Sequence, residues 1–475
     1  MYIYLDRRIL KMKMPEFLEK DVPCLALELP DEVKKYRDLY DFDGEIEVID
    51  RLLFAMDKNT DMAKRLAFEK IIAAGLRDDY KITEEELLAQ IKERFPRCTL
   101  QTIRRLTEMN YADHIIKDGK IYYQDSVKRN LFGAGKVFLE SLDEQGNICS
   151  YEPRPDNLRN EAFLALKEQG VRAYRFTVKM KLAVKDEFAR PGEEITVHIP
   201  YPAICDCQPY SELIESSHPA YISEAGHRTA CIKTVLKEND QFFVTFKFDR
   251  VVKYLELDEN CVSAEQPSFY THEALPHIRF TPYLVELAHK IKGDEENPLK
   301  IAKRVYDYIT ENINYSFLRD YLFIDQIPEY VLKNGKGDCG AQALTFITLC
   351  RILKVPARWE SGCRVGPNIN GIHDWAQIYV APYGWIPVDL TDGGGARRNL
   401  DTLKRAYSFG NLDPFRMTAC NDFQLEFDPP KKFMRCDPYD NQLGEAEYND
   451  YGLGFGTMIR EKEILAVEDV SELYR

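Results

Sequence analysis

The most constraining feature of this 475-residue sequence is the segment CGAQALTFITLCRIL, residues 339–353. At 3.6 residues per turn, its apolar side chains point to nearly every side of a helix, whereas a surface helix keeps one polar face. The segment therefore predicts a helix enclosed by other elements. With 45% hydrophobic and 30% charged residues, the chain is typical of a soluble globular protein. Its length suits about two to four domains, which can supply that enclosure.

The residues NGKGD, 334–338, predict how this helix begins. Asp338 is a good N-cap, and Gly335 and Gly337 allow a sharp turn into the helix. Cys339 then lies in the first turn, where unpaired N–H groups and the helix dipole favour a thiolate over a thiol. We therefore expect an activated cysteine that works with a proton-transferring partner.

Charge and cysteine spacing limit the partners and the compartment. The net charge of −14 argues against a polyphosphate or an anionic membrane surface as the main partner. The sequence has no run of 18 apolar residues and no signal-peptide pattern, so we expect no membrane association and a cytoplasmic location. The twelve cysteines form no framework, and the tightest pair, Cys205 and Cys207, is a CxC rather than the CxxC of a zinc site. We therefore expect core thiols, no metal and no cofactor.

The sequence divides into three regions that together predict an α+β fold. Residues 1–155 repeat apolar residues three and four apart, which predicts a mostly helical domain with Gly75 placed to end one helix. Residues 156–268 contain β-branched and aromatic runs separated by turn residues, which predicts a β-rich, sandwich-like domain. In residues 269–475 the helix period returns, and we expect a core around Cys339 with a C-terminal extension.

Within the first region, residues 81–128 show the order of elements of a winged helix. Thr83 with Glu86 fits a capping box, Thr99 could cap a second helix, and the dipeptide Asp118-Gly119 signals a tight turn between two extended runs. This segment is the only hint of nucleic-acid binding, and its nearly balanced charges argue against that function. The alternative is a helical domain that packs on its neighbours.

A partner for the thiol lies downstream, in HDWAQIYVAPYGWIPVDL, residues 373–390. Two strands joined around Pro382 would place His373 opposite Asp389, because the midpoint between them falls in the turn region. The carboxylate could then fix the tautomer of the imidazole. The helix that bears Cys339 is expected to pack against this same face of the hairpin.

Two tryptophans in these segments are candidates for a substrate cleft. Trp375 has the parity of His373, so it should share its face of the strand. The register that opposes His373 to Asp389 also pairs Trp385 with Gln377 on that face. We expect Trp375 and Trp385 either to line the cleft or to be core packing for the sheet.

Each of these residues also has a purely structural interpretation. A single cysteine at the start of a buried helix is more often a small core residue, and a single histidine on a strand is usually structural. Asp389 could simply begin a turn. All three together, each at the end of a regular element, favour catalysis.

Three blocks of the sequence resemble the motif blocks of bacterial proteins with a transglutaminase-like core, which has a papain-like fold. These blocks are GDCGAQALTFITLCRILKVPARWESG, HDWAQIYVAPYGWIPVDLTDG and FGNLDPFRM. The resemblance spans about residues 270–425. It implies Cys339 as the nucleophile, His373 as the general base and acid, and Asp389 as the residue that orients His373. It also implies an oxyanion hole built from the backbone N–H of Cys339 and an upstream side chain, for which Tyr315 is the candidate.

The chemistry implied by this resemblance is attack of a thiolate on an amide, followed by an acyl-enzyme. Resolution by water, as in a cysteine peptidase or amidase acting on a peptide or protein, is the first expectation. A protein-glutamine transglutaminase or deamidase is the alternative. A non-catalytic peptide-binding scaffold is an alternative of another class. The sequence contains no motif for calcium.

Overall fold

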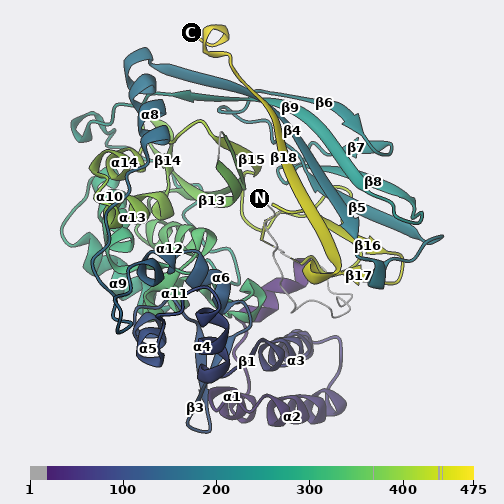
Figure 1. Cartoon of the computed structure of the whole chain (residues 1–475). Helices are drawn as coiled ribbons and strands as arrows, with labels where there is room; N and C mark the ends of the chain where they lie inside the picture. Colours follow the sequence, from purple (N-terminus) through teal and green to yellow (C-terminus); the bar gives the residue numbers. More distant parts are fainter. Residues whose placement is uncertain (1–18, 367–368, 437–438, 441) are drawn as a thin grey trace.

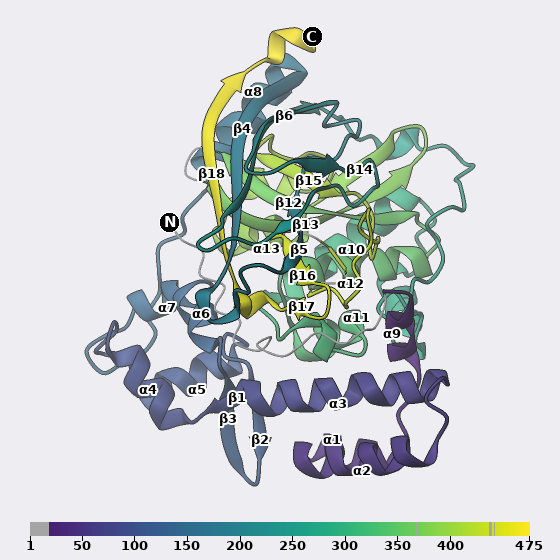
Figure 2. The same cartoon turned by 90° about the vertical axis from the view of Figure 1, so that its right-hand side faces the viewer.

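The fold is taken from a computed structural model, which describes residues 19–366, 369–436, 439–440 and 442–475. In Figures 1 and 2 the N-terminal helices form the lower part of the molecule. Two long sheets and a helix-covered core lie above them, side by side. The chain is therefore a mixed α+β, multidomain protein.

The N-terminal part consists of three helices followed by a helix pair, a small sheet and two short helices. Its elements are α1 (Asp31–Asp38), α2 (Phe42–Ala55), α3 (Asp61–Asp79), β1 (Tyr80–Ile82), α4 (Glu84–Lys92), α5 (Leu100–Glu108), β2 (His114–Lys117), β3 (Lys120–Gln124), α6 (Val127–Phe132) and α7 (Lys136–Glu140). The sheet has the order β1-β3-β2, so α4 and α5 precede a hairpin as in a winged helix.

The local signals of this helix pair are confirmed. The Thr83 side chain accepts the N–H of Glu86, and the Glu86 carboxylate accepts the N–H of Thr83, which together form a capping box. Thr99 caps α5 in the same way. Asp118 and Gly119 have φ values of 51° and 73°, the left-handed conformation that a two-residue hairpin turn requires.

Gly75, by contrast, does not end a helix. Helix α3 continues through it to Asp79, and Gly75 is buried inside the helix. The ring of Phe323, which belongs to the core, packs so closely that a Cβ on Gly75 would overlap it. The glycine therefore permits a close contact between the N-terminal helices and the core.

The two large sheets contain strands from the middle of the chain and from its C-terminal part. Their elements, with the helix that precedes them, are α8 (Asn157–Gln169), β4 (Val171–Val184), β5 (Glu194–Pro200), β6 (Tyr210–Ser216), β7 (Ala220–Ile222), β8 (Thr229–Val235), β9 (Phe242–Lys253), β16 (Glu445–Tyr448), β17 (Gly452–Leu453) and β18 (Met458–Asp469). One sheet has the order β17-β16-β5-β8-β7 and the other β18-β4-β9-β6. Buried apolar side chains of both sheets, such as Phe176 and Val197, form one shared core.

Strands β16 and β18 belong to the two large sheets, whereas the predicted organisation assigned residues 269–475 to the core and its C-terminal extension. Strand β18 pairs antiparallel with β4 from Met458–Val184 to Asp469–Tyr174, and β16 pairs with β5. Both pairings join residues more than two hundred positions apart. A periodic sequence pattern reports the strands themselves but not such distant partners.

The core surrounds helix α12. Its elements are α9 (Pro282–Lys292), α10 (Pro298–Asn312), β10 (Asn314–Tyr315), α11 (Ile327–Asn334), β11 (Lys336–Gly337), α12 (Cys339–Ile352), β12 (Ala357–Gly366), β13 (Ile369–Val380), β14 (Gly384–Val388), α13 (Leu390–Arg398), α14 (Thr402–Tyr407) and β15 (Arg416–Cys420). Every residue of α12 from Gly340 to Ile352 is buried, which confirms the predicted enclosed helix. The sheet beside it has the order β14-β13-β12-β15.

A buried ion pair ties this core to the N-terminal part close to the start of α12. Lys336 Nζ in β11 lies 2.8 Å from Asp113 Oδ1, and both side chains are almost fully buried. Separation of the two residues would leave a buried charge without a partner, which is strongly unfavourable. The ion pair therefore holds β11 against the N-terminal part. This places the segment that leads into Cys339.

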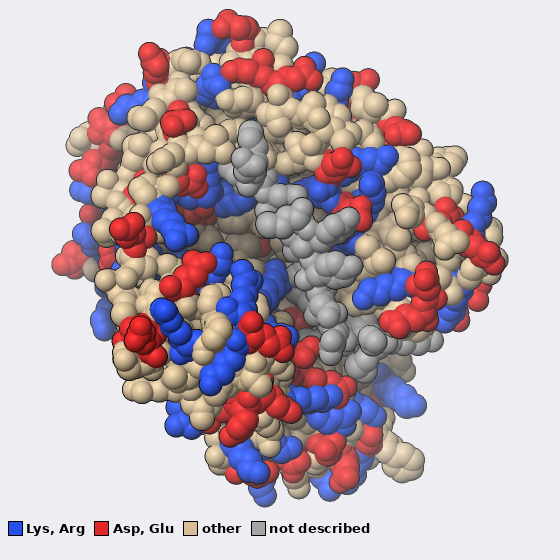
Figure 3. Space-filling model, viewed as in Figure 1, with Lys and Arg blue, Asp and Glu red and all other residues tan. Residues whose placement is uncertain are grey.

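The surface mixes charges of both signs. On the face shown in Figure 3, Lys and Arg are interspersed with Asp and Glu rather than separated into large fields. Within the described residues, no helix is both long enough and apolar enough to cross a membrane.

Candidate functional site

The N-terminus of α12 presents Cys339 to the central sheet. Asp338 caps the helix, because its carboxylate accepts the N–H of Ala341 at 3.2 Å. The thiol of Cys339 donates to Asp374 Oδ2 at 3.2 Å, and Asp374 also accepts a hydrogen bond from the side chain of Gln442. Tyr321 donates its hydroxyl to Asp338. The sulfur therefore lies among carboxylates and a tyrosine.

This environment corrects the predicted thiolate. Burial raises the pKa of Cys339 well above its usual value, and the charges of Asp374 and Asp338 raise it further. The helix dipole supplies only about half a positive charge, which two neighbouring carboxylates outweigh. In this arrangement Cys339 is a protonated thiol that donates a hydrogen bond.

His373 and Asp389 do come together. His373 Nε2 lies 2.7 Å from Asp389 Oδ2, and Arg416 donates to the same oxygen at 2.7 Å. The other oxygen of Asp389 caps helix α13 by accepting the N–H of Asp392 at 2.8 Å. Burial lowers the pKa of His373 to about 4, and the charge of Arg364 contributes to the same direction. The imidazole is therefore neutral at neutral pH.

The hairpin that brings them together has a different register from the predicted one. Tyr379 pairs with Trp385, and Val380 pairs with Gly384. The predicted register would leave one residue to turn the chain, whereas three residues connect the strands here. Asp389 consequently lies beyond the end of β14, as the N-cap of α13. The error shifts the pairing by two residues and keeps the face, which is why Asp389 still reaches His373.

Cys339 and His373 contact different faces of β13. Successive side chains of a strand point to opposite faces, and Asp374, which holds the thiol, directly follows His373. Among the residues that the structure describes, the hydrogen bond of Cys339 Sγ goes to Asp374, and no hydrogen bond joins the sulfur to the His373 ring. The predicted packing of α12 against the His373 face is therefore wrong, because Ala376 and Ile378, which share the parity of Asp374, join α12 in one hydrophobic core.

The hydrogen bonds of the His373 ring determine which of its two nitrogens carries the proton. Arg364 Nη2 lies 2.9 Å from Nε2, but it also donates to Asp392 Oδ2 at 2.9 Å. A ring N–H that donates to Asp389 satisfies Nε2, so we assign the proton of the neutral ring to Nε2. Nδ1 is then a basic nitrogen with no hydrogen-bond partner in the described part of the chain.

The tryptophans do not line a cleft beside the thiol. Trp375 is fully buried, donates its Nε1 proton to Glu360, and stacks on His373 with ring centroids 6.0 Å apart. Trp385 is half-buried, and the guanidinium of Arg358 lies 4.0 Å above its ring. Trp375 lies on β13 and Trp385 on β14, where it pairs with Tyr379, so both rings share the face of the sheet that is opposite to α12. For Trp375, the alternative of core packing is the one observed.

Tyr315 lies beside the segment that leads into Cys339. Strand β10 pairs with β11, so Tyr315 is opposite Gly337, two residues before Cys339. Burial raises the pKa of Tyr315 well above its usual value, and the charge of Cys339 raises it further. The hydroxyl is therefore a proton donor close to Cys339.

Sequence reasoning missed several residues of the site. Asp374 could have been found, because it follows His373 and strand alternation places it on the opposite face. Arg416 lies in the third motif block, FGNLDPFRM, but nothing in that block indicates a contact with Asp389. Tyr321 and Gln442 lie outside the three motif blocks, and no local pattern relates them to Cys339.

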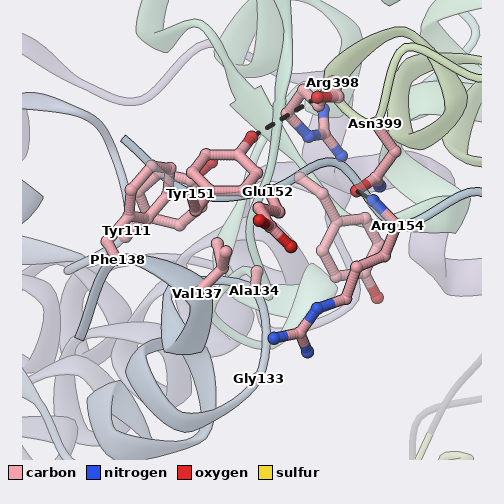
Figure 4. A pocket seen from close by; sticks show the side chains of 11 residues that line it. Tyr111, Gly133, Ala134, Val137, Phe138, Tyr151, Glu152, Arg154, Arg398 and Asn399 are labelled. Carbon is pink, nitrogen blue, oxygen red and sulfur yellow. Dashed lines mark hydrogen bonds between the residues drawn. The ribbon is translucent and has the colours of Figure 1, made fainter. Parts of the chain in front are cut away.

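A cavity of about 360 Å³ lies next to Tyr315, between the N-terminal part and α13. Figure 4 shows the rings of Tyr111, Phe138 and Tyr151 gathered on one side of it. Phe138 contacts both tyrosines, with centroids 5.1 and 5.5 Å apart. The Tyr151 hydroxyl donates to the backbone carbonyl of Arg398, which connects the two walls. The cavity is thus an aromatic pocket that shares Tyr315 with the surroundings of the thiol.

Comparisons with known proteins identify the core. Residues 285–390 match the model of the transglutaminase-like superfamily. Over 176 residues the chain is 31% identical to an uncharacterized protein of Haemophilus influenzae, a match that covers 30% of this chain and 47% of that protein. Over 126 residues it is 25% identical to the uncharacterized protein YebA of Bacillus subtilis, a match that covers 22% of this chain and 17% of YebA. The matches thus span about half or less of these relatives.

Two solved structures show weaker, structural similarity. A candidate cysteine protease from Cytophaga hutchinsonii has 15% identity and a TM-score of 0.38, over 63% of this chain and 98% of that one. The periplasmic domain of TgpA from Pseudomonas aeruginosa has 12% identity and a TM-score of 0.28, over 54% and 99%. The family match over the core, together with the motif blocks, identifies residues 285–390 as a domain of the transglutaminase-like superfamily.

Proposed function

We propose that this protein catalyses thiol-dependent acyl transfer on amide bonds, most simply the hydrolysis of a peptide or amide. Cys339 is the nucleophile, His373 the general base and acid, and Asp389 the residue that orients His373. The observation that carries the proposal is the 2.7 Å contact between His373 Nε2 and Asp389, which leaves the basic Nδ1 free. A neutral imidazole oriented in this way is suited to accept a proton from a thiol.

The proposal requires one rearrangement. Because His373 points to the other face of β13, the start of α12 and this part of β13 must shift so that Cys339 exchanges its hydrogen bond to Asp374 for one to His373. In the arrangement described above, the thiol is protonated and the site is at rest. Substrate binding that displaces Asp374 from the sulfur would remove the nearest negative charge and favour the thiolate.

Once the thiol reaches Nδ1, the reaction follows from the residues present. The thiol proton passes to His373, and the sulfur attacks the amide carbonyl. The resulting oxyanion is stabilised by the backbone N–H of Cys339 and the Tyr315 hydroxyl. His373 returns the proton to the leaving amine as the C–N bond breaks. It then takes a proton from the water that attacks the acyl-enzyme, and it gives this proton to Cys339 as the C–S bond breaks. A substrate side chain that enters the aromatic pocket would bring its backbone toward Tyr315.

A peptide and glutamine-amide library tests the proposal with the purified 475-residue chain. Released ammonia, released amine and new amino termini are measured together. New termini indicate a peptidase and ammonia alone a deamidase, whereas ammonia with incorporation of an added amine indicates a transglutaminase. Cys339→Ala and His373→Ala should abolish turnover, and Cys261→Ala, at an exposed cysteine away from the site, should retain it. Full turnover in Cys339→Ala would disprove the proposal.

A peptide-binding scaffold without turnover is the second candidate. The observation that favours it is the contact between Cys339 and Asp374, which keeps the thiol protonated. In this case library peptides bind the wild type and Cys339→Ala equally, and neither protein releases a product.

A further inference from the structure

The turn that connects β5 to β6 places two thiols beside the central sheet. Cys205 and Gln208 exchange two backbone hydrogen bonds, with N···O distances of 3.2 and 2.8 Å. The buried Gln208 side chain donates to the carbonyls of Ala203 and Thr418, which fixes the turn against β15. Within this turn, the sulfurs of Cys205 and Cys207 are 3.5 Å apart. Both residues are half-buried.

A third donor comes from the sheet itself. Glu360 in β12 is almost fully buried, and a carboxylate oxygen lies with the two sulfurs so that all three atoms are within 4.8 Å of one another. The indole N–H of Trp375 donates to this carboxylate and fixes its orientation. Metal-ligating carboxylates are commonly held by such a hydrogen bond.

The geometry points to a zinc site formed by Cys205, Cys207 and Glu360, with the fourth position open to water. Thiolate sulfurs bind Zn²⁺ at about 2.3 Å, so two of them on one tetrahedral ion are about 3.8 Å apart. The observed separation of 3.5 Å needs only a small adjustment. Two thiolates and a carboxylate are borderline-soft ligands that suit this ion.

The charge around the site supports the same ion. Arg250 is buried, and it interacts electrostatically with Cys205, Cys207 and Glu360. Three negative ligands exceed the charge of one Zn²⁺ by one, and the guanidinium compensates for that excess. A buried site that is neutral overall avoids the cost of an uncompensated charge.

The site explains why the spacing of Cys205 and Cys207 alone does not predict zinc binding. Two cysteines in so short a motif provide half of a tetrahedral site, and the third ligand stands more than 150 residues downstream. The ion would connect the sheet formed by β6 and its neighbours to the core sheet. We therefore expect Zn²⁺ to stabilise the contact between these two parts of the molecule.

Cobalt titration of the reduced 475-residue chain tests the site, because Co²⁺ takes the place of Zn²⁺ and thiolate ligands give a charge-transfer absorption. We expect one equivalent to bind with this absorption, and Zn²⁺ to displace it and raise the melting temperature. Cys205→Ser and Cys207→Ser should lose the absorption, and Glu360→Gln, which keeps an oxygen acceptor for Trp375, should weaken binding about tenfold or more. Cys261→Ser and Cys339→Ser should bind like the wild type.

Two results would overturn the zinc site. The first is Co²⁺ binding without thiolate absorption, which would place the ion away from the two cysteines, for example at His373, Asp389 and Asp392, a second cluster of candidate ligands among the described residues. The second is a reduced protein that binds no ion but readily closes a disulfide between Cys205 and Cys207 in peptide mass mapping. Neither these two results nor the cobalt titration depends on the proposed enzymatic activity.

Discussion

At the scale of single residues, two aspartates contact the two reactive side chains of the candidate site, Cys339 and His373. Asp389 lies 2.7 Å from an imidazole nitrogen, whereas Asp374 accepts a hydrogen bond from a thiol and raises its pKa. The two aspartates perform opposite tasks, because one faces a base and the other faces an acid. Substitution of each one therefore has a distinct expected effect.

Asp374→Asn should make Cys339 more reactive. The change removes the negative charge nearest to the sulfur, so the pKa of the thiol should fall, and each unit of decrease gives about tenfold more thiolate at neutral pH. Iodoacetamide labelling followed by peptide mapping measures the rate at Cys339, with the exposed Cys149 and Cys261 as internal references. An unchanged rate at Cys339 relative to these references would show that Asp374 does not suppress the thiol.

Asp389→Asn should reduce turnover strongly while the fold is retained. Asparagine can still cap α13 through its side-chain oxygen, but it no longer selects the tautomer of His373. In a serine protease the corresponding change costs about 10⁴ in rate. Turnover of the library substrate and the melting temperature are measured together. Near-normal turnover would remove Asp389 from the site, and Asp392 would be the next residue to substitute.

At the scale of elements, local signals were the best predictors. The caps at Thr83 and Thr99, the turn at Asp118 and the enclosed helix α12 follow from residues within a few positions of one another. The register of the β13–β14 hairpin was missed by two positions, because a symmetric midpoint ignores how many residues a turn needs. The face of β13 against which α12 packs was also missed, since it depends on tertiary packing.

Gly75→Ala tests the packing of α3 on the core. Alanine favours a helix by about 1 kcal/mol over glycine, yet its Cβ would overlap the ring of Phe323. Overpacking of this kind costs about 1–3 kcal/mol, so we expect a net destabilisation of about 1 kcal/mol. Urea unfolding measures it, and Phe323→Leu in the same chain should restore part of the loss. A Gly75→Ala protein more stable than the wild type would mean that the ring moves aside freely.

At the scale of the whole molecule, several histidines are buried as neutral groups. Burial lowers the pKa of His198 and His277 to about 3 and that of His373 to about 4, whereas an unfolded histidine titrates near 6.5. Between pH 6.5 and about 4, the unfolded chain therefore binds protons that the native chain does not. The free energy of unfolding is fully retained above pH 6.5 and falls as the pH decreases through this window.

We therefore expect acid sensitivity to begin above the range in which carboxylates titrate. At pH 5, about 1.5 units below the unfolded pKa, each histidine can account for a loss of up to about 2 kcal/mol, because one pKa unit corresponds to about 1.4 kcal/mol. Urea midpoints at pH 7.5 and pH 5 measure the loss. His277→Asn, which keeps an acceptor for the N–H of Ile327, should reduce it. Equal midpoints at the two pH values would show that these histidines are protonated in the native state.

The pairing of β16 and β18 with β5 and β4 has a further consequence for how the parts depend on one another. The two large sheets, made of β4–β9 and β16–β18, form one two-sheet unit. The transglutaminase-like core is an insertion within this unit, since the chain leaves it after β9 and rejoins it at β16. Both ends of the insertion are anchored to the same scaffold. A single backbone cleavage between residues 421 and 436 would therefore leave the two fragments associated through the strand pairs on either side. The two-sheet unit, in turn, cannot complete its hydrogen bonding until the core has been synthesised.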